Sequence, residues 1–267
     1  MTLPTLFVPH GAPTFALRPG AAGAALVDLA QTLRRPKAIV VISPHWETRE
    51  PTVGSASDLE TIYDFAGFPR ELYTLTYPAH GNAELALQVA TCLQNAGYSA
   101  RMDPHRGLDH GAWVPLRMMY SAADIPVIPL SIKAHAGAAY HYALGAALRP
   151  LREEGFLIIG TGSITHNLRD YMQCIHGGLP TPAYVPRFAD WINDQLQSHL
   201  IDNLLDYRKT SIDAAQAHPT EDHFMPFFVA LGAAGTGARA ERFYAGVDDL
   251  VIAMDGYRFE PQASAVQ

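Results

Sequence analysis

Length, composition and charge indicate a globular protein and exclude several classes of partner. The 267 residues are 48% apolar and 17% charged, which is ordinary for one large domain with a well-filled core. The formal net charge is −7 and no block of Lys or Arg is present, so neither a nucleic acid nor an anionic membrane surface is expected as the main partner.

Apolar runs and helical spacing predict strands that alternate with helices. In chain order we expect a strand over Thr5–Val8, a helix over Ala21–Leu33, a strand over Ala38–Ser43, a helix over Asn82–Asn95, a strand over Tyr98–Met102, a helix over Trp113–Tyr120, a strand over Ile125–Leu130, a helix over Ala138–Leu151, a strand over Phe156–Gly160, helices over Val185–Leu205 and Phe224–Ala233, and late strands at Phe243–Tyr244 and Tyr257–Phe259. This alternation predicts an α/β fold: a single domain over residues 1–267, with a central, mostly parallel sheet flanked by helices. The tail, 261–267, is expected to be frayed.

Residues 47–80 show little helical periodicity and many turn and aromatic residues. A long segment of this kind in a compact domain is usually functional. We therefore expect the 47–80 segment to cover the site.

Nothing in the sequence marks the chain for export or for a membrane. Its two cysteines cannot form a disulfide framework, and Pro4 and His10 interrupt the N-terminal apolar run, which lacks a basic region. No stretch approaches the roughly 20 apolar residues that span a bilayer. We expect a cytoplasmic protein, and the sequence leaves its oligomeric state open.

Five of the 12 histidines follow strand-like or turn-like segments. They are His10, His45, His110, His166 and His223. Because the ligand crevice of an open α/β sheet lies at the carboxyl ends of its strands, imidazoles far apart in sequence can converge there. Neutral imidazole is the commonest metal ligand, so a metal ion is the expected occupant of that point.

Spacing alone leaves the nature of this site open. The sequence has no His-Glu-x-x-His helix and no Cys-x-x-Cys pair. The turn Gly160–Ser163 lacks the second glycine of a Gly-x-Ser-x-Gly elbow, so Ser163 is expected to turn the chain rather than act as a nucleophile. Four other histidines in helical or loop contexts are expected to be structural: His135, His141, His176 and His199.

Six short motifs extend over nearly the whole chain, and five of them contain one of the five histidines. They are Pro9–Thr14, Ser43–Trp46, Ile62–Pro69, Leu108–Trp113, Gly160–Leu168 and His223–Pro226. In content and order they closely resemble the 4,5-DOPA extradiol dioxygenase family, which belongs to the class III extradiol ring-cleaving dioxygenases.

The resemblance implies a site for one divalent metal ion, Zn²⁺ or Fe²⁺, bound by His10, His45 and His223. It implies acid–base chemistry for His166, which is also a possible additional ligand, and contact with substrate or bound oxygen for His110. The implied substrates are a small aromatic diol, a catechol of the DOPA kind, and O₂.

One difference from the wider class leaves the identity of the metal ion undetermined. Many extradiol enzymes hold Fe²⁺ with two histidines and one carboxylate, whereas here the third position is His223, with Glu221 and Asp222 beside it. Three neutral histidines also suit Zn²⁺ with water as the fourth ligand. Two alternatives therefore stand beside the dioxygenase: a zinc hydrolase with His166 as proton shuttle, and a non-catalytic metal-binding protein.

Several neighbouring residues are secondary candidates. Ser43, Asp109 and Asn167 could orient imidazoles, although a turn or cap role is the favoured explanation of each. The aromatic residues of 63–68 could form a wall for a flat substrate, or could pack in the core. Trp46 and Trp113 could contact substrate or hold loops in place.

Overall fold

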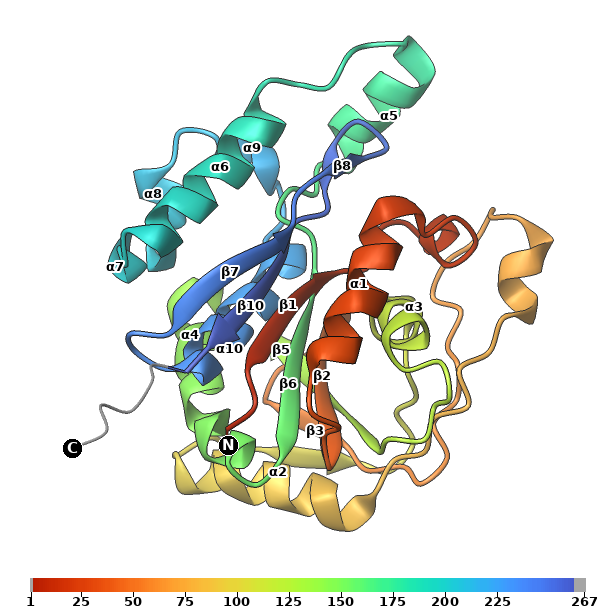
Figure 1. Ribbon diagram of the computed structural model, residues 1–267, viewed down its shortest axis with the longest axis vertical. Helices are drawn as coiled ribbons and strands as arrows, with labels where there is room; N and C mark the ends of the chain where they lie inside the picture. Colours follow the sequence, from red (N-terminus) through yellow and green to blue (C-terminus); the bar gives the residue numbers. More distant parts are fainter. Residues whose placement is uncertain (1, 262–267) are drawn as a thin grey trace.

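Eight strands form one sheet in the computed structural model, which describes residues 2–261 (Figure 1). In spatial order the strands are β4 (Arg101–Asp103), β3 (Thr52–Gly54), β5 (Val127–Lys133), β2 (Ala38–Thr48), β6 (Phe156–Gly162), β1 (Thr5–Pro9), β10 (Gly256–Glu260) and β7 (Arg239–Tyr244). The central strands β5, β2, β6 and β1 are parallel, whereas β10 runs antiparallel to β1 and β3 antiparallel to β5. The predicted α/β class with a mostly parallel central sheet is confirmed.

The remaining elements are helices and one small hairpin. The α-helices are α1 (Gly20–Thr32), α2 (Ala83–Asn95), α3 (His110–Met119), α4 (Gly137–Leu148), α5 (Leu168–Gly177), α6 (Tyr184–Gln197), α7 (Ile201–Leu205), α8 (Tyr207–Thr210), α9 (Ala214–Ala217) and α10 (Met225–Ala234). The 3₁₀ helices are η1 (Pro13–Ala16), η2 (Arg70–Thr74), η3 (Arg149–Arg152) and η4 (Asp222–Phe224), and the hairpin pairs β8 (Val247–Asp248) with β9 (Ile252–Ala253).

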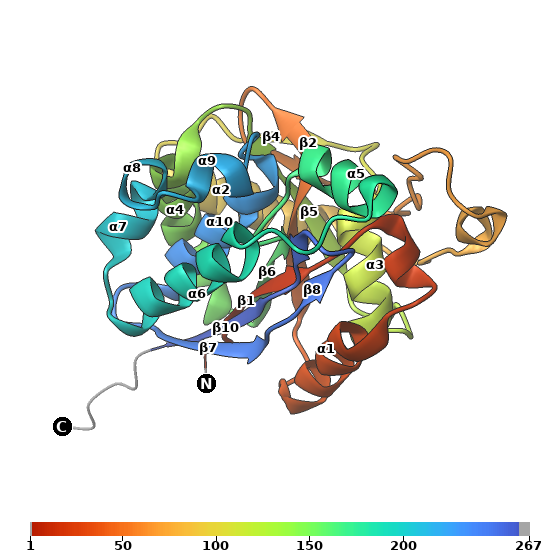
Figure 2. The same cartoon turned by 90° about the horizontal axis from the view of Figure 1, so that it is seen from above.

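The central strands are mainly apolar, as expected for strands whose two faces are both covered by helices. Val40 and Ile158 pack on one face, in a core that includes α4 and α10, whereas Val41 and Ile159 pack on the other face with α1 and α3. Figure 2 shows α4 and α10 on one side of the sheet and α1 and α3 on the other. The sheet is thereby fixed in place, and the ends of its strands become a rigid base for a site.

The carboxyl ends of β1, β2 and β6 meet at one edge of the sheet. β1 and β2 both pair in parallel with β6, so their following residues emerge on the same side. His10 directly follows β1, and β2 continues beyond its predicted end to include His45. The pairing of β2 with β5 shifts register between Ile42 and Glu47, around the segment that carries this histidine. The edge expected to hold the site is therefore built as predicted.

The prediction for residues 168–205 was wrong in two respects. The single helix expected over Val185–Leu205 is divided into α6 and α7, because His199 adopts a left-handed φ of 54°. Buried Leu196 and Leu204 continue the apolar spacing through the break, which is why the pattern suggested one helix. Helix α5 was not predicted, although Asn167 caps its start and Gly178, with φ 66°, ends it.

Smaller differences concern element ends. Helix α3 begins at His110, three residues before the predicted start, because the Asp109 side chain accepts a hydrogen bond from the Ala112 N–H. The edge strand β4 is shorter than the predicted Tyr98–Met102 and pairs with β3 alone. Strand β3 and helix η2 lie in the 47–80 segment, where no element was expected.

Two further expectations concern membranes and the tail. Within residues 2–261 no helix has both the length and the apolar character needed to span a bilayer. The expectation for the tail falls on residues 262–267, which lie outside the described part.

His141 on α4 illustrates the structural histidines. Its Nδ1 donates to the Gly137 carbonyl (2.7 Å) and its Nε2 accepts from the Lys133 N–H (3.1 Å), so the neutral ring is fully hydrogen-bonded. Burial lowers the pKa of His141 to about 4, although the Gly137 hydrogen bond and Glu221 oppose the shift. The ring therefore stays neutral at pH values where the unfolded chain is protonated.

We predict a stability loss in acid that depends on His141. As the pH falls from about 6.5 to about 4, the unfolded state binds a proton at His141 that the folded state does not, so the free energy of unfolding falls by up to roughly 3 kcal/mol. Urea unfolding of wild type and His141→Gln at pH 7.5, 6, 5 and 4 measures this contribution. The wild-type advantage should shrink towards pH 4; a difference that stays constant with pH would contradict it.

Candidate metal centre and active site

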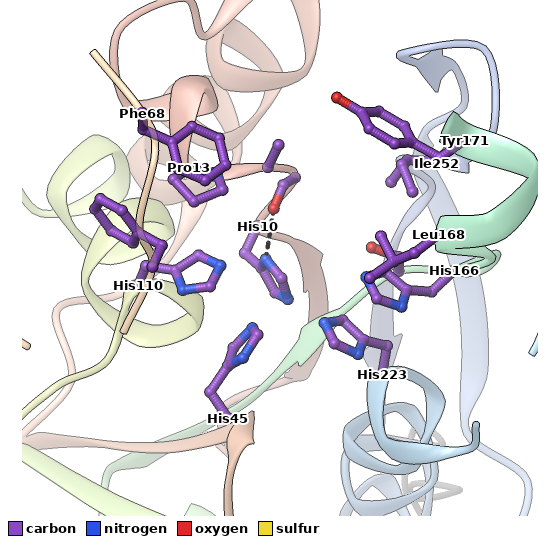
Figure 3. A pocket seen from close by; sticks show the side chains of 14 residues that line it. His10, Pro13, His45, Phe68, His110, His166, Leu168, Tyr171, His223 and Ile252 are labelled. Atoms are coloured by element: carbon purple, nitrogen blue, oxygen red, sulfur yellow. Dashed lines mark hydrogen bonds between the residues drawn. The ribbon is translucent and has the colours of Figure 1, made fainter. Parts of the chain in front are cut away.

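All five predicted histidines line one cavity of about 270 Å³. His10 follows β1, His45 lies in β2, His110 begins α3, His166 lies in the loop between β6 and α5, and His223 lies in η4. Figure 3 shows their rings around a common space. Residues more than 200 positions apart in sequence therefore contribute to one site.

The rings are close enough to share a ligand. The ring centroid of His10 lies 5.1 Å from that of His45 and 5.3 Å from that of His223, and the His45 and His223 centroids are 4.9 Å apart. The His110 centroid lies 4.1 Å from His45, and the His166 ring stacks on His223 at 3.4 Å. No backbone segment separates the imidazoles.

Two glycines permit this close approach. A Cβ at Gly111 would lie 2.4 Å from the Ser43 Oγ and 2.8 Å from the Cδ2 of His45, so a side chain there would keep α3 away from β2. A Cβ at Gly162 would lie 2.2 Å from the carbonyl oxygen of His223. Both contacts are shorter than van der Waals separation, so the site depends on glycine at the end of β6 and at the start of α3.

Backbone hydrogen bonds place His166 beside His223. The Ser163 N–H donates to the His223 carbonyl (3.2 Å), and the His166 N–H donates to the Ala217 carbonyl (2.8 Å). The loop after β6 is thus attached to the segment that precedes α10. The result is the parallel stack of the two imidazoles.

The outer nitrogens of two rings are hydrogen-bonded to acceptors, and that of a third lies near a carboxylate. The Nδ1 of His10 lies 2.8 Å from the Gly11 carbonyl oxygen, the Nδ1 of His223 is bonded to the Asp222 carboxylate, and the Nδ1 of His45 lies 3.5 Å from a carboxylate oxygen of Asp64. At His10 and His223 the acceptor favours the proton on Nδ1 and leaves the Nε2 lone pair available, as in metal-binding histidines.

The inner nitrogens fit a metal ion. Within the described residues, the buried Nε2 atoms of His10 and His45 have no hydrogen-bond partner. Buried polar atoms without a partner are costly, and a cation would satisfy both of these. Two groups have ligand atoms within 4.8 Å of one another: His10, His45 and His110, and separately His166, Asp222 and His223. The predicted set of His10, His45 and His223 takes members from both groups and is not itself one of the two, so it stays a prediction.

Burial keeps four of the imidazoles uncharged. It lowers the pKa of His45 and of His166 to about 4, and it lowers the pKa of His10 and of His223 well below the usual value. Repulsion between the neighbouring rings acts in the same direction, whereas the Asp222 carboxylate partly offsets the shift at His166. Neutral imidazoles are the form that binds a metal and the form that accepts a proton.

Asp64 is the carboxylate that sequence reasoning passed over. It lies in the quoted motif Ile62–Pro69, and both of its carboxylate oxygens lie 2.9 Å from the Nδ1 of His110. Burial would raise the pKa of Asp64, but hydrogen bonds and attraction from His110 lower it to about 2. The position of Asp64 among the aromatic residues of this motif was the sequence signal that could have identified it.

The secondary candidates mainly support the loops. Ser43 donates to Asp109 (2.5 Å), and Asn167 caps α5 and donates to the Gln216 carbonyl (2.8 Å); the bonds found for Asn167 in the described structure reach no imidazole. The Trp113 indole N–H donates to the Ile62 carbonyl (3.2 Å), and the Arg106 guanidinium lies 4.9 Å from the Trp46 ring centre.

Apart from Ser163, mainly apolar and aromatic side chains form the rest of the cavity. Phe65 and Phe68 come from the 47–80 segment, Leu168 and Tyr171 from α5, and Ile252 from β9. Among the described residues, no Lys, Arg, Asp or Glu lines this cavity. The expected cover by the 47–80 segment is present, whereas the walls from α5 and the hairpin were not anticipated. The cavity therefore suits a flat, largely apolar molecule with polar groups at the histidine end.

Comparison with known proteins gives the same picture. Residues 23–247 match the family described as "Catalytic LigB subunit of aromatic ring-opening dioxygenase". A 4,5-DOPA dioxygenase extradiol from Beta vulgaris is 40% identical over 259 residues, covering 96% of each chain, and one from Escherichia coli K12 is 35% identical over 238 residues, covering 86% of this chain and 85% of that one.

The fold is also shared with a solved structure. The crystal structure of the uncharacterized protein JW3007 from Escherichia coli K12 has a TM-score of 0.78 and 30% sequence identity, over 96% of this chain and 99% of that chain. The prediction of a ring-cleaving enzyme, made from the six motifs, is confirmed, and the hydrolase and the non-catalytic binder are set aside. This chain belongs to the metal-dependent LigB family and is an extradiol ring-cleaving dioxygenase.

Proposed function

We propose that this chain opens the ring of a DOPA-like catechol beside its two hydroxyls, with O₂ as co-substrate and one metal ion bound by His10, His45 and His223. The observation that supports it is a set of neutral imidazoles at the base of an apolar cavity, with unpartnered Nε2 atoms among the described residues. The names of the relatives from Beta vulgaris and Escherichia coli suggest the DOPA-like substrate. The whole chain is proposed to act as one catalytic domain.

Fe²⁺ is the proposed metal. When bound, it supplies a redox-active centre that favours ionised catechol oxygens and provides open positions for the diol and O₂. Zn²⁺ fits three histidines equally well but has no redox chemistry of its own. The zinc form is therefore expected to bind catechol without consuming O₂.

Different residues of the chain are proposed to transfer protons and to position the substrate. His166 is proposed to accept a catechol proton and later return it, because its ring is neutral, half-buried and close to Asp222. His110 is proposed to contact the substrate or bound oxygen from the opposite side of the cavity, and His166 remains a possible additional ligand. Phe65 and Phe68 are proposed to pack against the ring and exclude water.

We predict that anaerobically reconstituted Fe²⁺ protein consumes O₂ with catechols, including DOPA, and forms a yellow semialdehyde. An oxygen electrode measures the consumption of O₂, and visible absorption measures the formation of the semialdehyde. Benzenediols with non-adjacent hydroxyls are the control, since they cannot chelate through both oxygens. No consumption of any catechol in a broad panel would refute the proposed function.

Single histidine substitutions should separate metal binding from chemistry. We predict that His10→Ala, His45→Ala and His223→Ala lose the metal, whereas His110→Ala and His166→Ala retain it and lose kcat by about 100- to 10,000-fold. Elemental analysis and steady-state kinetics give the two readouts. The exposed His176 supplies the control variant His176→Ala, which should match wild type in both. Equal metal content in all five site variants would contradict the proposed division.

The aromatic wall should affect binding more than chemistry. We predict that Phe68→Ala raises KM for catechol by about fivefold, because roughly 1 kcal/mol of apolar contact is lost. Leu87→Ala, at an exposed position on α2 that does not line this cavity, is the matched control. An unchanged KM in Phe68→Ala would exclude this residue from the substrate wall.

A further inference from the structure

The Asp64 carboxylate contacts two of the five site histidines. Each of its oxygens lies 2.9 Å from the Nδ1 of His110, and its Oδ1 also accepts the backbone N–H of His110 at 3.0 Å. The same carboxylate lies 3.5 Å from the Nδ1 of His45. Three of these contacts converge on His110, which makes it the main partner.

A short backbone ladder brings Asp64 to this position. The Leu108 N–H donates to the Glu60 carbonyl (2.8 Å), and the Ile62 N–H donates to the Leu108 carbonyl (2.8 Å). Two residues further along, the Asp64 side chain accepts the N–H of His110, where a backbone carbonyl would continue the pattern. The ladder requires Gly107, because a Cβ there would lie 2.3 Å from the Glu60 carbonyl oxygen.

The chemistry of the pair fixes the tautomer of His110. An ionised carboxylate only accepts hydrogen bonds, so a ring nitrogen held by both of its oxygens carries the proton. The Nδ1 of His110 therefore carries a proton, and in the tautomer with that single proton Nε2 is an acceptor on the cavity side. An acceptor at that position can receive a hydrogen bond from a substrate hydroxyl.

Asp64 also joins this ring to the substrate wall. The next residue, Phe65, lines the cavity, and its ring lies edge-on to His110 with centroids 5.6 Å apart. Any movement of the segment that carries Phe65 would move the acceptor of the His110 proton. The contact between Asp64 and His110 therefore holds both the His110 ring and the Phe65 side of the cavity in place.

We infer that Asp64 is a positioning residue for ring opening: it holds His110 in the Nδ1-protonated tautomer, with Nε2 directed at the substrate, and fixes the Phe65 wall beside it. This inference rests on the proposed function for its effect on rate. The tautomer itself is a property of the protein without substrate. The two can therefore fail separately.

Nitrogen NMR of ¹⁵N-histidine-labelled, zinc-loaded protein tests the tautomer directly, with His110 assigned by comparison with His110→Gln. Wild type should show protonated Nδ1 and unprotonated Nε2 at His110. Asp64→Ala should lose this signature, whereas Asp64→Asn should largely keep it, because the amide oxygen still accepts from Nδ1. Asp58→Ala, which removes an exposed carboxylate from the same 47–80 segment, should match wild type.

Kinetics of the Fe²⁺ enzyme give the second readout. Asp64→Ala should lower kcat by about 10- to 100-fold with KM changed less than about threefold and metal content unchanged, and Asp64→Asn should recover most of the rate. Gly107→Ala keeps the carboxylate but displaces the ladder, so it should reproduce the altered NMR signature of Asp64→Ala.

Three results would overturn the inference. They are an Nε2-protonated His110 in wild type, a wild-type tautomer and kcat in Asp64→Ala, or a metal content that falls in step with activity, which would assign Asp64 to the metal centre through His45. If wild type cleaves no catechol but shows the expected tautomer, the proposed function fails while the positioning of His110 by Asp64 stands.

Discussion

The site depends on keeping several imidazoles uncharged within a shared, buried space. Ring centroids 4 to 5 Å apart would repel strongly if two rings were protonated, and burial removes the water that would screen them. Both effects favour neutral rings, and a neutral ring with its Nδ1 proton engaged offers a free lone pair at Nε2. Burial and repulsion between rings therefore disfavour protonation and leave nitrogen lone pairs available to a metal cation.

The acceptors near the Nδ1 atoms determine which nitrogen of each imidazole is directed into the cavity. Gly11, Asp222 and Asp64 each take the Nδ1 side of a different histidine, and they come from three separate segments of the chain. A carboxylate thus accompanies two of the proposed ligands without taking a ligand position in the proposed set. This arrangement differs from the two-histidine, one-carboxylate centre of many extradiol enzymes, since the acidic groups act through the imidazoles.

The central sheet forms the base of the site, and more peripheral elements form the walls of the cavity. The base of the cavity follows strands buried on both faces, and Gly111 and Gly162 allow the chain segments to approach closely. The walls come from the 47–80 segment, α5 and the β8–β9 hairpin, which lie outside the central sheet.

Much of this arrangement could be predicted from the sequence because its signals are local. The apolar runs before His10 and His45 identify strands, and the parallel sheet then brings both histidines to one edge. The remainder depends on contacts between distant segments. Helix α5 buries only Cys174 and exposes apolar residues such as Met172, and the left-handed residue His199 breaks a helix whose apolar spacing continues. The bond between Asp64 and His110 joins residues 46 positions apart, so no spacing rule could find it.

The most direct test of the account is anomalous diffraction at the iron edge from crystals of the iron-loaded protein. The account predicts one peak about 2.0–2.2 Å from the Nε2 atoms of His10, His45 and His223. A peak bound instead by His10, His45 and His110, or by His166, Asp222 and His223, would contradict it.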